Sequence, residues 1–113
     1  MTGVTVDRDG PPVQVRGGQI RIFGELTIQH AEDLKPLLLA SLPTDGSVAR
    51  IDLAAVSEID TAGIQLLMAA NREVVNRGTA LQIVAVSQVV QEALELFRQT
   101  TLMNPPMGAG ARA

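Results

Sequence analysis

The chain has 113 residues, a formal net charge of −3, 46% apolar and 19% charged residues, and no cysteine. This length predicts one domain, and the composition is that of a globular protein rather than a disordered one. Without cysteine there is no disulfide framework and no thiolate metal site, and the single histidine, His30, cannot form a histidine cluster. Scattered basic residues and only two aromatic ones, Phe23 and Phe97, argue against a nucleic-acid partner.

Residues 1–12 are predicted to be a flexible N-terminus, and they lack the charged-then-apolar pattern of a signal peptide. No apolar run approaches the roughly 20 residues that a membrane span needs. We therefore expect a cytoplasmic protein without direct membrane insertion.

The first predicted elements are two strands joined in a hairpin. Apolar and polar residues alternate over 13–16 and again over 19–22, and Gly17-Gly18 is the turn between them. Residues 24–26 are interpreted as the end of the second strand.

A first helix is predicted over residues 30–42. Its apolar stripe consists of Leu34, Leu37, Leu38 and Leu42. Glu32 and Asp33 are expected in its first turn, where the helix dipole favours negative charge. Pro36 is tolerated if the helix starts near Asp33, and otherwise it should bend or loosen the opening turn.

The second half of the chain alternates strands and helices. Residues 48–54 are predicted as a strand, 57–60 as a short turn, 61–77 as a helix stopped by Gly78, and 81–86 as a further strand. Ser87 is expected to cap a last helix whose apolar stripe is Val90, Leu94 and Phe97. The Pro- and Gly-rich residues 104–113 are predicted to be a disordered tail.

This order predicts an α/β fold: an N-terminal β-hairpin, then βαβαβα with a mostly parallel sheet packed against helices. The crossovers from Ile20 through Ile51 to Ile83 imply parallel neighbouring strands. The folded domain is expected to span residues 13–103.

Little in the sequence favours catalysis. The acidic pairs Glu32/Asp33 and Glu92/Glu95 are expected on outer helix faces, and one histidine without cysteine leaves no nucleophile–base pair. Gly63 alone does not make a phosphate-cradling loop. The sequence predicts a protein that is not an enzyme, with no cofactor and no metal.

The stretch Asp60-Thr61-Ala62-Gly63 opens the second long helix and allows two interpretations. In the first, Asp60 caps the helix and Thr61 simply occupies its first turn. In the second, the Thr61 hydroxyl is the group that the protein presents to a partner at this helix start. Gly63 either lets the helix pack closely on the sheet or leaves a flat patch for a partner.

Two segments carry a resemblance to a known family. The stretch "IDLAAVSEIDTAGIQLLMAANREVVNRGTALQIVAV" and the preceding "GQIRIFGELTIQHAEDLKPLL" resemble the STAS domain, found in sulfate transporters and anti-sigma factor antagonists. The resemblance implies a STAS-like fold and a protein-interaction role in bacterial signal transduction. In the antagonist branch, a partner kinase phosphorylates the hydroxyl that here is Thr61, whereas Ala62 departs from the frequent second Ser.

The resemblance leaves the partner open. One hypothesis is a phosphoprotein of the anti-sigma factor antagonist or chemotaxis type, which binds a Ser/Thr kinase that is also the anti-sigma factor, or a chemotaxis protein. The alternative is a constitutive accessory subunit of a phospholipid-trafficking ABC transporter ATPase, and a nucleotide- or lipid-binding domain is a weaker third reading. The predicted partner-binding residues are Ser57, Glu58, Asp60, Thr61, Ala62, Gly63 and Ile64.

Overall fold

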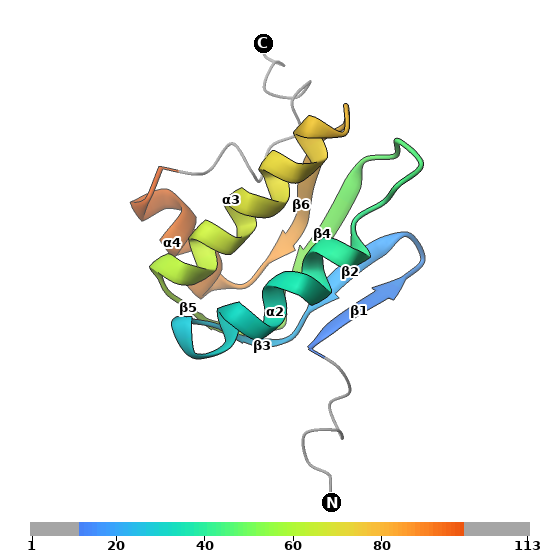
Figure 1. Ribbon diagram of the computed structural model, residues 1–113. Helices are drawn as coiled ribbons and strands as arrows, with labels where there is room; N and C mark the ends of the chain where they lie inside the picture. Colours follow the sequence, from blue (N-terminus) through green and yellow to red (C-terminus); the bar gives the residue numbers. More distant parts are fainter. Residues whose placement is uncertain (1–11, 99–113) are drawn as a thin grey trace, which may run out of the picture.

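The computed structural model describes residues 12–98 (Figure 1). Its elements are β1 (Val13–Arg16), β2 (Gln19–Ile22), β3 (Gly24–Leu26), α2 (Ile28–Ser41), β4 (Ala49–Leu53), β5 (Val56–Ile59), α3 (Thr61–Asn76), β6 (Leu81–Val86) and α4 (Gln88–Leu96). The predicted tails, residues 1–12 apart from Pro12 and residues 104–113, lie outside the described residues, as does the end of the predicted domain at 99–103.

The main sheet has four strands in the order β1-β2-β4-β6. β1 and β2 form the predicted antiparallel hairpin, and β2, β4 and β6 are parallel. In the register, Ile20 lies opposite Ile51, which lies opposite Ile83. The predicted α/β fold with a mostly parallel sheet is therefore confirmed.

A second sheet, which the sequence did not reveal, pairs β3 with β5 in parallel. Residues 24–26 are not the end of β2, because the chain leaves the main sheet at Phe23. Residues 57–60 were also wrongly predicted as a turn, since all but Asp60 belong to β5 and the turn lies at Ala54-Ala55. Each short strand is defined by backbone pairing with the other, about 30 residues away in the chain, rather than by a pattern of its own.

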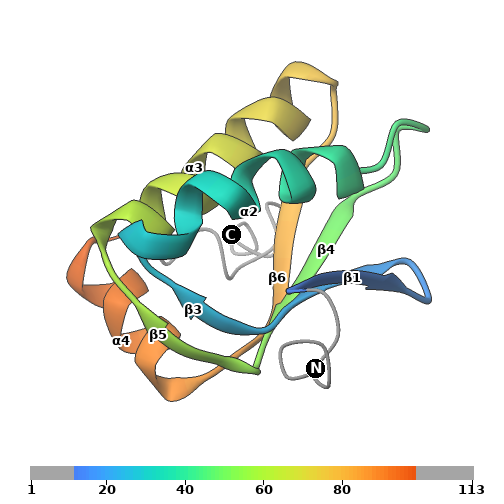
Figure 2. The same cartoon turned by 60° about the horizontal axis from the view of Figure 1, so that its bottom comes forward.

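Helices α2 and α3 pack side by side on one face of the main sheet, and α4 packs on β5 (Figure 2). The core between these layers is aliphatic. Its most deeply buried large side chains are Ile22, Leu26, Leu38, Ile51, Leu53, Val56, Leu67, Val74, Val90 and Leu94. Their burial supplies the main driving force for folding in a chain with so few aromatic residues.

Helix α2 begins at Ile28, two residues before the predicted start. Consequently Glu32 and Asp33 do not lie in its first turn, and Pro36 lies in the interior of the helix. Proline cannot donate the hydrogen bond that a helix makes to the carbonyl four residues earlier, here that of Glu32. Both residues are exposed, so water can satisfy that carbonyl.

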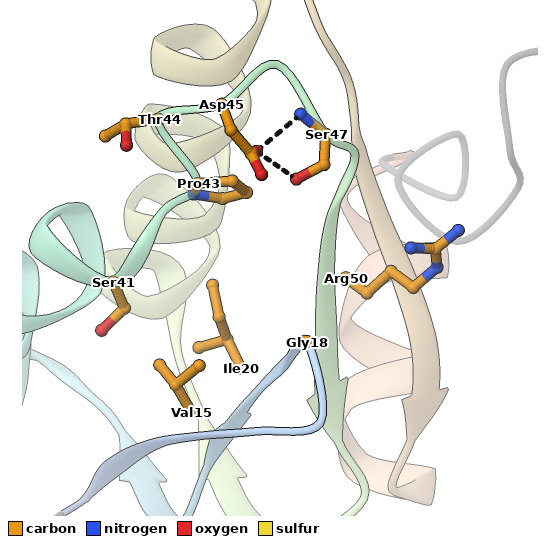
Figure 3. A pocket seen from close by; sticks show the side chains of 9 residues that line it. All are labelled: Val15, Gly18, Ile20, Ser41, Pro43, Thr44, Asp45, Ser47 and Arg50. Carbon is orange, nitrogen blue, oxygen red and sulfur yellow. Dashed lines mark hydrogen bonds between the residues drawn. The ribbon is translucent and has the colours of Figure 1, made fainter.

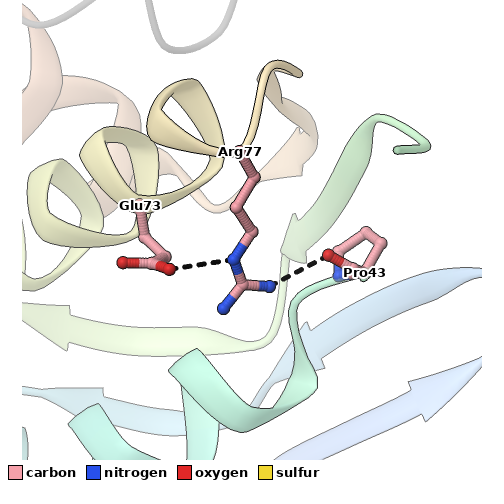
Figure 4. A network of polar contacts seen from close by, with 3 residues as sticks. All are labelled: Pro43, Glu73 and Arg77. Atoms are coloured by element: carbon pink, nitrogen blue, oxygen red, sulfur yellow. Dashed lines mark hydrogen bonds and ion pairs between the residues drawn. The ribbon is translucent and has the colours of Figure 1, made fainter. Parts of the chain in front are cut away.

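Helix α3 ends at Asn76, and Gly78 follows with a φ of 86°, as the predicted stop requires. Arg77 ties this end to the loop after α2 (Figure 4). Its Nε lies 2.8 Å from Glu73 Oε2, and a second guanidinium nitrogen donates to the Pro43 carbonyl at 3.0 Å. The ends of α2 and α3 are thereby held together.

Helix α4 is capped as predicted, because the Ser87 side chain accepts from the Val90 N–H. Val90 and Leu94 are buried, but Phe97 is 40% exposed. The prediction that Phe97 belongs to the buried stripe is wrong, since the helix ends at Leu96 and Phe97 is its C-cap.

Candidate partner-binding site

Two strand ends and two helix starts meet at one end of the domain (Figures 1 and 2). β3 leads into α2 through Thr27, and β5 leads into α3 through Asp60. Since β3 and β5 are parallel neighbours, their carboxyl ends lie side by side. Such an edge is where open α/β sheets place their binding residues.

Asp60 connects the two helix starts. Its Oδ1 accepts from the Gly63 N–H at 3.2 Å, so Asp60 is the N-cap of α3, as one interpretation of the sequence required. Its Oδ2 accepts from the Ile28 N–H, the first residue of α2, at 3.0 Å. The hydrogen bond from Ile28 is the main reason why the pKa of the Asp60 carboxyl is lowered below 3.8.

Thr61 is the first residue of α3, and its side chain is exposed. Within residues 12–98, the Thr61 hydroxyl takes part in no hydrogen bond, because Asp60 already serves as the cap. The hydroxyl is therefore accessible at the surface for modification or binding. It lies at a helix N-terminus, where backbone N–H groups favour anions.

The other predicted partner-binding residues divide into exposed and buried ones. Ser57 and Glu58 are exposed and Ala62 is half-buried, whereas Gly63 and Ile64 lie inside the domain. A Cβ on Gly63 would overlap the Leu26 carbonyl oxygen and lie 2.8 Å from Ile59 Cγ1. Gly63 thus permits the close approach of α3 to β3.

Three residues at this end were not among the predicted partner-binding residues: Ile28, Glu25 and His30. Ile28 is 73% exposed beside Asp60. Glu25 and Glu58 are paired across β3 and β5, and His30 Nε2 lies 3.4 Å from Glu25 Oε1. Only one feature of the sequence could have pointed to Ile28 as a binding residue: it is apolar, lies shortly after a predicted strand and does not belong to the leucine stripe of the following helix.

A hollow lies at the other end of α2 (Figure 3). This open depression of about 250 Å³ is lined by Val15, Gly18, Ile20, Ser41, Pro43, Thr44, Asp45, Ser47 and Arg50. The Asp45 carboxylate is occupied by the Ser47 hydroxyl and N–H, at 2.6 and 3.0 Å, and these bonds lower the pKa of Asp45. Among the described residues, no group of three His, Cys, Asp or Glu side chains is arranged to hold a metal ion.

The matching family model is described as "Mlab, STAS domain", and it aligns with residues 12–104. The chain belongs to the STAS domain family. Solved structures share the fold of this STAS domain. The anti-sigma factor antagonist SpoIIAA in its unphosphorylated form is 17% identical, with a TM-score of 0.63 over 88% of this chain and 92% of that one.

A second similar structure is an anti-sigma factor antagonist from Mycobacterium paratuberculosis. It is 21% identical, with a TM-score of 0.64 over 80% of this STAS domain chain and 79% of the other. A search of curated protein sequences finds no match. Over residues 12–98, none of the STAS domain's helices is long and apolar enough to cross a membrane.

Proposed function

We propose that this STAS domain is a non-enzymatic interaction module of the bacterial cytoplasm whose binding to a protein partner is switched by phosphorylation of Thr61. The observation that carries the proposal is the separation of two roles at the start of α3. Asp60 caps the helix, and the neighbouring Thr61 hydroxyl is exposed and engaged in no described hydrogen bond. Modification of Thr61 would therefore leave the helix cap in place.

A phosphate at this position would change the surface more than the fold. It adds about −1.5 to −2 charges at neutral pH, and the first turn of a helix tolerates or favours such a charge. The surface around it already carries Glu58 and Asp60. A partner that binds the unmodified hydroxyl would then meet an added charge, which is costly to bury without a pairing group.

The proposed partner is a Ser/Thr kinase that is also an anti-sigma factor, or a chemotaxis protein. The similar structures support this choice, because two of them are anti-sigma factor antagonists and one is named for its unphosphorylated form. Their identity to this chain is low, so the support comes from a shared fold.

A second candidate is the constitutive accessory subunit of a phospholipid-trafficking ABC transporter ATPase. Two observations favour it: the matching family model is the Mlab one, and Ala62 leaves a single hydroxyl in the motif. In this case Thr61 would contact the ATPase directly, without phosphate chemistry.

The test begins with affinity-tagged wild-type chain, isolated from its source cells so that the bound protein can be identified by mass spectrometry. The purified partner is then incubated with ATP and either wild type, Thr61→Ala or Thr44→Ala, and phosphate is located by peptide mapping. Thr44 is an exposed threonine in the loop after α2, and it serves as the control acceptor. We expect phosphate on wild type and Thr44→Ala, and none on Thr61→Ala.

Binding measurements separate the two candidates. Thr61→Glu should weaken binding by about a hundredfold, and Thr61→Ala should bind like wild type. If Thr61→Ala abolishes binding and no phosphate is transferred, the hydroxyl itself is the contact and the constitutive subunit is correct. If both variants bind like wild type, Thr61 is only part of a helix start and the switch is refuted.

A further inference from the structure

Ile28 is an apolar residue in a place where folding does not require one. It is the first residue of α2, and 73% of its surface is exposed, although the buried face of this helix is formed by Leu34 and Leu38. An exposed isoleucine on its own is common on protein surfaces. Ile28 is of interest because it lies close to Thr61, the proposed site of phosphorylation.

The structure fixes Ile28 beside Thr61 through Asp60. The Ile28 N–H donates to Asp60 Oδ2 at 3.0 Å, and the Asp60 N–H donates to the Leu26 carbonyl at 3.2 Å. Ile28 and Thr61 are each the first residue of their helix, and the Asp60 carboxylate accepts from the Ile28 N–H of one helix and from the Gly63 N–H of the other. One protein surface that covers Thr61 will also reach Ile28.

The strands below these helix starts carry an acidic pair. Glu25 and Glu58 are direct partners in the parallel β3–β5 register, so their side chains share a face of the small sheet. Like charges placed opposite each other destabilise a sheet. His30 lies within 3.4 Å of Glu25, whereas Glu58 is exposed and has no ion pair within the described part of the chain.

We infer that the partner of the Thr61 surface inserts Ile28 into an apolar pocket and places basic side chains opposite Glu25 and Glu58. This surface, consisting of Ile28, Glu25, Glu58 and Thr61, is here called the docking surface. The inference rests on the proposed function, because it describes the partner that acts on Thr61. In protein interfaces, a buried apolar anchor supplies much of the affinity. Charged residues around it favour a partner of complementary charge.

The experiment uses the purified kinase partner and the full chain. Binding of wild type, Ile28→Ser and Glu58→Lys is measured by titration calorimetry at two salt concentrations. Val75→Ser and Glu92→Lys are the matched controls, since Val75 is 56% exposed near the far end of α3 and Glu92 is exposed on α4. Each control repeats the chemical change of its test variant away from the docking surface.

We expect Ile28→Ser and Glu58→Lys each to weaken binding by about tenfold or more, while both controls stay within about twofold of wild type. Added salt should weaken the binding of wild type more than that of Glu58→Lys, because the variant lacks the attraction that salt screens. In the kinase assay, Ile28→Ser should raise KM for the chain and leave kcat unchanged. The melting temperature of Ile28→Ser should equal that of wild type, and that of Glu58→Lys should equal or exceed it, because the lysine removes the like-charge pair with Glu25. These results would exclude unfolding as the cause of weaker binding.

The outcomes distinguish the inference from the proposed function. If the kinase phosphorylates Thr61 and both docking-surface variants bind like wild type, the inference is wrong and the switch stands. If wild type is never phosphorylated by its partner, the proposed function fails and the kinase inference fails with it.

Discussion

Gly63 offers a sharp test of how the start of α3 is held. In a Gly63→Ala variant, the new Cβ would overlap the Leu26 carbonyl oxygen and lie 2.8 Å from Ile59 Cγ1 and 2.9 Å from Leu26 Cβ. Contacts under 3.0 Å are essentially never observed for a real Cβ, so something must shift. The main obstacle is backbone, which cannot rotate away, and α3 must therefore move off β3.

The size of the effect follows from two opposing contributions. Forcing an extra carbon into a packed interior costs about 1–3 kcal/mol, and the upper end applies because the obstacle is a backbone atom. Alanine is favoured over glycine inside a helix by about 1 kcal/mol. The net loss in the free energy of unfolding is about 2 kcal/mol, which corresponds to a fall in Tm of roughly 8–16 °C for a domain of this size.

Thermal unfolding of Gly63→Ala, followed by circular dichroism, measures this loss. Gln65→Ala is the control, because Gln65 is exposed two residues further along the same helix and should change stability by no more than about 0.5 kcal/mol. A Tm for Gly63→Ala equal to or above that of wild type would refute the close approach of α3 to β3.

Two further predictions concern the cap and the last helix. Asp60→Asn should be less stable than wild type at neutral pH, and the gap in the free energy of unfolding should narrow as pH falls below about 4. The pKa of Asp60 is lowered in the folded protein, so its stabilisation is complete above the unfolded-state pKa and is lost as pH falls through the folded-state pKa. Urea midpoints at pH 7 and pH 3 measure this gap, and equal gaps would contradict the assigned role. Leu94→Ala should lower the free energy of unfolding by about 2–5 kcal/mol, because the Leu94 side chain is fully buried on the inner face of α4. A urea titration showing a loss under about 1 kcal/mol would mean that α4 is not packed as described.

The main sheet could be predicted because its signals are local and repeated. Alternating apolar residues define β1 and β2. Two helical crossovers make β2, β4 and β6 parallel neighbours, so that Ile20, Ile51 and Ile83 lie opposite one another. The small sheet could not be predicted, because β3 has only three residues and the sequence of β5, Val-Ser-Glu-Ile, does not alternate apolar and polar residues. Their partner strands, rather than their own sequences, make them strands.

The candidate site shows the same division between local and distant signals. The cap by Asp60 was one of the two interpretations of the motif, and it follows from local spacing, since the acceptor and the Gly63 N–H lie three residues apart. The hydrogen bond from the Ile28 N–H to the Asp60 carboxylate joins residues 32 positions apart, and no sequence pattern predicts it. The motif left open whether Gly63 packs on the sheet or faces a partner, and the close approach of α3 to β3 favours packing. Ile64 was predicted among the partner-binding residues, but only 2% of its surface is exposed.

The division into two sheets has a consequence for the way the domain opens. The four-stranded sheet is joined by three ladders of hydrogen bonds, whereas β3 and β5 share one short ladder. Segments with fewer protected backbone amides open at lower free energy than the rest of a domain. The end that carries Thr61 is thus the natural unit of local unfolding, and a partner that binds only its closed form would stabilise it by linkage. Binding would then be recorded as slower exchange of the β3 and β5 amides with solvent, far more than of those in β2 and β4.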